Sequence, residues 1–123
     1  MKKKGFQVLK IAEDMRQAVI ELFKDMENDA QTLSKDSEKP LVVHHDTKQM
    51  SYVVKGQGYV AVNDNILKII EGDLIIIDKK STHSFICSEG DIELMHIHWP
   101  KANVDLDREV INDYYSAWDK YIK

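Results

Sequence analysis

Histidines and a glutamine are the residues of this chain whose types suit metal or ligand binding. Two adjacent histidines, His44 and His45, and Gln49 lie in the stretch VVHHDTKQMSYVVKGQG, residues 42–58, at the start of a run that alternates apolar and polar residues. Neutral imidazole is the commonest metal ligand among side chains. A buried histidine can equally donate one hydrogen bond and accept another without any metal. The stretch is therefore either part of a metal site or a polar strand end that holds two imidazoles.

The two adjacent histidines must point to opposite faces of a regular strand, because side chains an even number of residues apart share a face. His45 shares its face with Val43. We expect His45 to point inward and His44 to lie at the surface, unless a β-bulge exchanges the two.

Three later strands carry the other candidate groups. The sets that share a face are Gln49, Ser51 and Val53, then His83, Phe85 and Cys87, then Ile92, Leu94, His96 and His98. Both faces of the last strand are mixed. Its histidines either point inward, as ligands or acid–base groups, or make polar contacts at a strand edge. We expect the Cys87 thiol to be buried and inert, since the spacing forms no Cys–His dyad.

The elements that position these groups are short and rich in Val, Ile and Tyr between residues 40 and 99, separated by Gly, Asn and Asp. The runs LVVHH, MSYVV, GYVAV, ILKII, DLIIID, HSFIC and IELMHIHW read as successive strands, with a tight hairpin turn at VNDN. Many short strands joined by tight turns predict a sandwich or barrel.

Helices are predicted on both sides of this β-rich region. Apolar residues at helical spacing predict one helix over about residues 12–27 and a second over about 105–121. Residues 28–39 between the first helix and the strands are polar, and we expect a loop there with at most a short edge strand. The second helix carries an aromatic stripe that would cover one end of the barrel or a partner subunit.

Composition excludes several classes of protein. The chain has 123 residues and a formal net charge of −4, which fits one domain over residues 1–123 and argues against nucleic acid as a partner. No window approaches the roughly 20 apolar residues that a membrane span needs. One cysteine and no export signal favour the reducing cytoplasm. No phosphate-binding glycine loop and no G-x-S-x-G nucleophile elbow are present.

Two motifs in the β-rich region resemble those of the cupin family, small β-barrels of the jelly-roll type. His45, three further residues, Gln49, six further residues and Gly56 match the end of the family's first motif, G-x5-H-x-H-x3–4-E-x6-G, and YVVKGQG is similar to its frequent YVLEGEG. The spacing from Gly72 to His83 matches the second motif, G-x5-P-x-G-x2-H-x3-N. The last strand, ELMHIHWP, also resembles the sensor domains of arabinose-type regulators, although no helix-turn-helix pattern follows it.

The resemblance also has departures. Val43 stands where the first motif has its first histidine, and Gln49 where it has glutamate. Asp78 and Lys80 replace the proline and glycine of the second motif, and Cys87 replaces its asparagine. The elements of the fold are thus kept better than the metal ligands.

The resemblance implies an all-β jelly-roll barrel with core residues of about 40–100, closed so that His45, Gln49 and His83 meet. Two imidazoles and an amide oxygen can bind a divalent first-row ion such as Fe, Mn, Ni, Zn or Cu. Binding would be weaker than with a carboxylate in place of the amide. The expected lining of a ligand pocket is Ser51, Val53, Phe85, His96 and His98.

Three functions follow from this reading. The first is a metal-dependent cupin that acts on a small polar molecule, as a dioxygenase, an isomerase or a lyase. The second is a metal-free module that binds or senses a small, sugar-like ligand. The third is an interaction protein built around the aromatic C-terminal helix. A homodimer is expected, because exposed strand edges and aromatic residues are favourable at interfaces.

Overall fold

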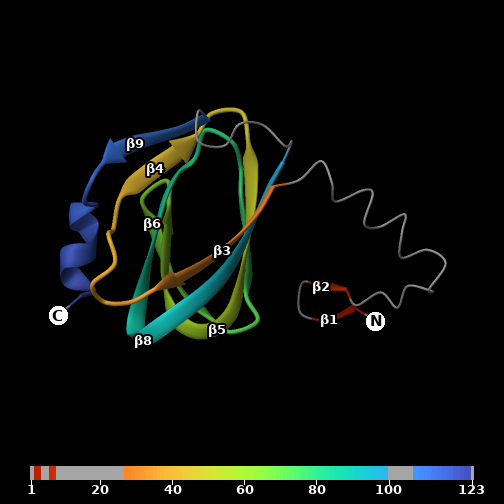
Figure 1. The fold of residues 1–123 in the computed structure, drawn as a ribbon, viewed down its shortest axis with the longest axis horizontal. Coiled ribbons are helices and arrows are strands. Elements are labelled where there is room, and N and C mark those ends of the chain that lie inside the picture. The colour runs from red at the N-terminus through yellow and green to blue at the C-terminus, as the bar shows by residue number, and fades with distance from the viewer. Residues whose placement is uncertain (1, 4–5, 8–26, 100–106, 123) are drawn as a thin grey trace.

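The computed structural model describes residues 2–3, 6–7, 27–99 and 107–122 (Figure 1). β1 (Lys2–Lys3) and β2 (Phe6–Gln7) form an antiparallel pair of their own. The helix predicted over residues 12–27 lies outside the described residues, apart from Glu27, which begins a strand. The remaining seven strands, β3 to β9, form one antiparallel sheet.

Two long strands hold this sheet together. β5 (Lys48–Val62) and β8 (Thr82–Trp99) run antiparallel along most of their length, so that Gln49 pairs with His98 near one end and Val62 with His83 at the other. The register shifts between Val53 and Gly58, where β5 bends. The bend folds the sheet into two facing halves.

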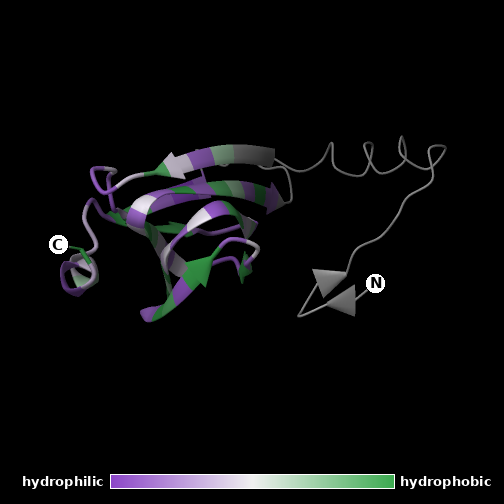
Figure 2. Ribbon diagram, turned by 90° about the horizontal axis from the view of Figure 1, so that it is seen from below, coloured by the Kyte–Doolittle hydropathy of each residue, from purple (hydrophilic) through white to green (hydrophobic). Residues whose placement is uncertain are grey.

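Shorter strands flank each half. The first, which we call the β3–β7 half, adds β3 (Glu27–Leu33) beside β8 and β7 (Leu74–Ile77) beside β5. The second, the β6–β9 half, adds β6 (Asn65–Ile70) beside β5, with β4 (Leu41–His44) beside β8 and β9 (Arg108–Asn112) beside β4. The result is the predicted all-β jelly-roll core, with hydrophilic and hydrophobic residues interspersed along its strands (Figure 2).

Two glycines let β5 and β8 approach each other at the bend. A Cβ atom added at Gly56 would lie 2.3 Å from the backbone oxygen of Asp91, and one at Gly58 would lie 2.0 Å from the backbone oxygen of Ile86. Neither position has room for a side chain. The glycines of YVVKGQG are therefore explained by the close crossing of the two strands.

The hairpin predicted at VNDN is confirmed. Val62 and Asn65 pair across the turn between β5 and β6, and Asn63 and Asp64 both have positive φ, 48° and 70°. Two consecutive residues with positive φ define the type I′ geometry that joins adjacent strands, and Asn and Asp tolerate that geometry better than most residues.

The apolar core fills one end of the space between the two halves. Its buried members come from both halves of the sheet: Leu33, Val53, Val60, Ile69, Cys87, Ile92 and Leu94. Cys87 is free and buried, as predicted, and burial raises the pKa of its thiol. The opposite end of the interior is polar and is described below.

The helix predicted over residues 105–121 is wrong. Arg108–Asn112 form strand β9, and Ser116–Lys120 form a short 3-10 helix (Figure 1). Trp118 is fully buried, and its Nε1 donates a hydrogen bond to Ser84 Oγ at 2.7 Å. Backbone pairing with β4 prevails over helical spacing, because tertiary contacts, rather than local pattern, supply most of the stability of a helix in a protein.

The aromatic residues of this C-terminal segment cover the outer surface of the β6–β9 half. Tyr115 and Trp118 form a cluster with Leu41, Ala61 and Ile86. The Tyr115 hydroxyl donates to Asp64 at 2.6 Å, a bond that raises the pKa of Tyr115 to about 12. These two aromatics are used within the chain, which removes much of the basis for an interaction protein built on them.

The polar stretch before the predicted barrel contributes more structure than expected. β3 pairs with β8 over seven consecutive positions, from Glu27 opposite His98 to Leu33 opposite Ile92. The sheet therefore extends beyond residues 40–100 on both sides.

No helix among the described residues is long and apolar enough to cross a membrane.

Candidate metal centre

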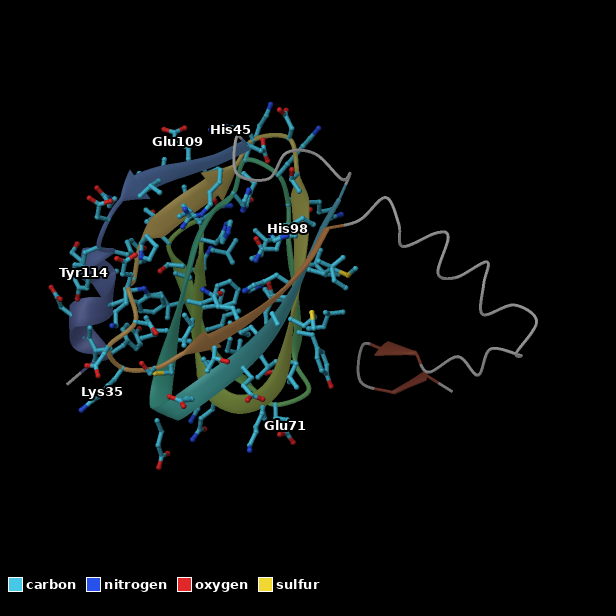
Figure 3. The ribbon with its side chains drawn as sticks, in the orientation of Figure 1. Lys35, His45, Glu71, His98, Glu109 and Tyr114 are labelled. Carbon is cyan, nitrogen blue, oxygen red and sulfur yellow. The ribbon has the colours of Figure 1, made fainter. Side chains whose placement is uncertain are left out.

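The polar end of the interior holds four of the five histidines. His44, His83, His96 and His98 are all at most 7% exposed, and they come from strands β4 and β8. Gln49 and Ser51 of β5 are buried among them. Figure 3 shows His98 inside the barrel and His45 at its rim. This concentration of buried polar side chains is the candidate site.

The predicted orientation of the adjacent histidines is wrong by one residue. Val42 pairs with the inward-facing His83 across the ladder between β4 and β8, so His44, two residues on, faces inward as well. The His45 side chain is half exposed, and its Nε2 lies 2.7 Å from Glu109 Oε1. Alternation could not decide between the two, because Val42 and Val43 are both buried.

The other side chains that were predicted to share a face do point to the same side of their strands. Gln49, Ser51 and Val53 are buried in the interior, as are His83 and Cys87, with Phe85 packed against the core. The open question about the last strand is answered by its apolar neighbours. Ile92 and Leu94 are buried with His96 and His98, whereas Glu93 and Met95 are exposed. Whether these side chains bind a metal or a ligand stays a prediction.

A chain of hydrogen bonds fixes the state of the two histidines on β8. His96 Nε2 lies 2.7 Å from Gln31 Oε1, which can only accept, so this nitrogen carries the proton. His96 Nδ1 then accepts from the Ser51 hydroxyl at 2.7 Å, and that hydroxyl accepts from Gln49 Nε2 at 2.8 Å. Gln49 Oε1 in turn accepts from His98 Nε2 at 3.0 Å. The lone pair of His98 is therefore on Nδ1.

This network gives Gln49 a second possible role. Its amide oxygen, the atom predicted to bind metal, accepts the proton of His98 instead. A backing oxygen of this kind fixes the tautomer and ring orientation of a ligating histidine. Metal binding by Gln49 stays a prediction, and the same oxygen would have to give up its hydrogen bond with His98 to bind the ion.

His83 is held in the same way by the backbone. Its Nδ1 lies 3.1 Å from the Ser81 carbonyl oxygen and must donate to it, which leaves the lone pair on Nε2. The His44 ring stacks on the His83 ring with centroids 5.5 Å apart and lies 5.1 Å from the His98 ring. Three imidazoles thus form a compact group around His44.

Burial keeps His44, His83 and His96 neutral at pH 7. Loss of hydration is the main cause that lowers the pKa of His83 to about 4 and that of His96 to about 4, with smaller contributions from the neighbouring histidines. The pKa of His44 is also lowered, first by burial and then by His98. A neutral imidazole is the form that binds a metal ion, so no proton has to be removed from the ring.

The donor set suits a metal, but its geometry is not preformed. Within residues 27–99 and 107–122, no group of three or more His, Cys, Asp or Glu side chains is arranged to hold a metal ion as the side chains stand. The donor set fits by its chemistry. Imidazole nitrogens suit Zn, Cu, Fe or Ni, and hydrogen bonds to an oxygen fix the tautomers of His83 and His98.

Sequence reasoning missed Gln31, which holds His96, and Asp107, whose Oδ1 accepts the backbone N–H of Asp46 at 2.8 Å. Gln31 lies in a polar stretch with no clear strand pattern. Asp107 lies in a segment whose spacing indicated a helix. Neither residue carries a local signal of its partner, since both contacts span more than 60 positions.

The family model of the Cupin domain matches residues 31–98, more than half of the chain. No curated protein matches the chain. Many solved structures do, and three illustrate the similarity.

A protein from Photorhabdus luminescens is 24% identical with a TM-score of 0.56, over 63% of this chain and 64% of that one. A cupin protein from Bacteroides fragilis is 16% identical with a TM-score of 0.58, over 82% and 89%. A Streptomyces protein solved with uridine is 17% identical with a TM-score of 0.58, over 73% and 72%. At these identities the structures support the fold alone. The family match and the jelly-roll fold agree, and the chain belongs to the cupin domain family.

Proposed function

We propose that this cupin binds a divalent first-row metal ion through His44, His83 and His98 and acts on a small polar molecule. The observation that supports the proposal is the group of three buried imidazoles, in which the ring centroids of His98 and His83 lie 5.1 and 5.5 Å from that of His44. An imidazole nitrogen bound at about 2.1 Å places its ring centre about 3 Å from the ion. Two rings at a tetrahedral angle then have centres about 5 Å apart. The two observed centroid distances match this spacing.

When bound, the ion would supply a Lewis acid that polarises an oxygen of the substrate or activates water or dioxygen. The chain's own residues do the rest. Gln49 and Ser81 hold the rings of His98 and His83 through hydrogen bonds. His96 has both ring nitrogens engaged, so it braces the site from Gln31 to Ser51. Three protein ligands leave coordination positions open, which suits dioxygenation, isomerisation or a lyase reaction.

Metal analysis tests this proposal directly. Protein purified without an affinity tag is stripped with a chelator, titrated separately with Zn²⁺, Ni²⁺, Co²⁺, Cu²⁺, Mn²⁺ and, without air, Fe²⁺, and analysed for stoichiometry. One ion bound per chain is the expected result. If no first-row ion binds at a 1:1 ratio, the proposal fails.

A metal-free ligand module is the second candidate. The specific observation that favours it is the continuous network from Gln31 through His96, Ser51 and Gln49 to His98, which forms without an ion. Such a network offers donors and acceptors to a polar ligand, and the similar Streptomyces structure contains uridine. Calorimetry of metal-stripped protein with sugars and nucleosides separates the two: only this candidate predicts binding without metal.

Self-association belongs to the same proposal. Five apolar side chains on the outer surface of the β3–β7 half are at least 37% exposed: Tyr52, Val54, Leu74, Ile76 and Met95. Tyr52 pairs with both Leu74 and Met95, so this patch is continuous across three strands. A homodimer would bury it.

We place the protein in a reducing compartment such as the cytoplasm, in keeping with its single, free cysteine.

A further inference from the structure

A carboxylate from the C-terminal segment reaches the rim of the histidine site. The Asp107 side chain is 5% exposed, and its Oδ1 accepts the backbone N–H of Asp46 at 2.8 Å. Its Oδ2 lies 3.6 Å from Nδ1 of His44. Asp107 thus lies between the turn that follows β4 and the histidine at the end of that strand.

The contact has consequences for the His44 ring. His44 Nδ1 is buried and has no hydrogen-bond partner at the usual distance, and the Asp107 Oδ2 oxygen lies beside it at 3.6 Å. An ionised carboxylate can only accept hydrogen bonds. The favoured tautomer therefore carries the proton on Nδ1, where it faces the carboxylate, and keeps the lone pair on Nε2.

The carboxylate is held in place by its backbone contacts. The Asp46 N–H donates to its Oδ1, which leaves Oδ2 directed at the His44 ring. Nearby pairing holds the segment in place: Arg108 is opposite His44 in the ladder between β4 and β9, and Glu109 binds the exposed His45. The carboxylate therefore stays next to the ring.

We propose that Asp107 is a positioning residue that fixes His44 in its Nδ1-protonated tautomer and orients its Nε2 lone pair for metal binding. The inference rests on the proposed function. It completes a common arrangement, because His83 and His98 already donate one ring N–H to the oxygens of Ser81 and Gln49. Each of the three imidazoles then has one nitrogen held by an oxygen and one that can bind the ion.

The test reads the tautomer directly in the metal-free protein at pH 7.5. Long-range ¹⁵N–¹H correlation spectra distinguish a protonated from an unprotonated ring nitrogen. The expected result for the parent is a His44 ring protonated on Nδ1. In Asp107→Asn, the Asp46 N–H should hold the side-chain oxygen, so the amide NH₂ group faces Nδ1 and the proton moves to Nε2. The spectra of His83 and His98 should not change.

A matched control and a second readout separate this inference from the proposed function. Glu109→Gln alters the neighbouring acid, which contacts only the exposed His45 among the histidines, and should leave the His44 tautomer unchanged. Zn²⁺ affinity should fall about 10–100-fold in Asp107→Asn but not in Glu109→Gln. Protonation of His44 on Nε2 in the parent, or an unchanged tautomer in Asp107→Asn, would overturn the inference. A parent with the expected tautomer that binds no metal would instead contradict the proposed function.

Discussion

His44 and His83 stack against each other inside the barrel from adjacent strands, with ring centroids 5.5 Å apart and planes inclined by 23°. This relationship follows from one backbone pairing, that of Val42 with His83. A shift of β4 by one residue would place His45 in the site and expose His44. The chemistry of the site therefore depends on strand register.

The buried histidines predict a loss of stability in acid. His83 and His96 have pKa values of about 4 in the folded protein, against 6.5 for the unperturbed group. Between these values the unfolded chain binds more protons than the folded one, so the free energy of unfolding should fall as pH decreases. The slope is about 1.4 kcal/mol per pH unit for each histidine. Urea denaturation of metal-free protein at pH 7.5, 6 and 5 measures it.

The exposed histidine supplies the control for this slope. His45→Ala removes an imidazole that is half exposed. The variant should keep the pH dependence of the parent, whereas His96→Gln should reduce it. Stability that stays constant from pH 7.5 to 5 would contradict the buried, neutral histidines.

The crossing of β5 and β8 should tolerate no side chain at Gly58. A Cβ atom there would lie 2.0 Å from the Ile86 backbone oxygen, so Gly58→Ala must displace a strand. We expect Gly58→Ala to lower the free energy of unfolding by at least about 3 kcal/mol. Gly90→Ala is the control: its positive φ of 62° costs about 1–2 kcal/mol, but no atom lies within 4 Å of the added group. Equal losses in the two variants would contradict the close crossing.

The C-terminal segment should contribute to stability through Trp118. Trp118→Ala removes a fully buried side chain and should cost about 3–5 kcal/mol. Trp118→Phe keeps most of the ring but loses the hydrogen bond to Ser84, and should cost about 1–2 kcal/mol. Chemical denaturation followed by circular dichroism checks both. If Trp118→Ala leaves the free energy of unfolding unchanged, the segment does not pack on the sheet.

The apolar patch on the β3–β7 half predicts the assembly state. Ile76 is 56% exposed within it, and a lysine there should oppose burial in a dimer without disturbing the core. Light scattering should give the mass of a dimer for the parent at micromolar concentration and of a monomer for Ile76→Lys. Val110→Lys, a substitution outside the patch, should remain dimeric. A monomeric parent would rule out this interface.

The sequence predicted the fold better than the site. Alternation and turn residues were enough for the strands between Leu41 and Trp99, because buried and exposed faces differ strongly along most of them. Strand β9 was missed because its five residues are all exposed and carry no alternation. The choice between His44 and His45 failed for the opposite reason, since residues on both faces of β4 are buried. Contacts such as His96 with Gln31 depend on pairing between distant strands, which no local pattern encodes.

The metal affinity of His44→Ala, compared with that of His45→Ala, decides whether the inward-facing histidine of β4 is a metal ligand. The two variants remove the same group from adjacent positions, one inside the barrel and one at its rim. We expect the parent and His45→Ala to bind one Zn²⁺ per chain with similar affinity, and His44→Ala to bind at least about 10–100-fold more weakly. Full binding by His44→Ala with loss in His45→Ala would contradict a metal site built on His44, as would a parent that binds no metal.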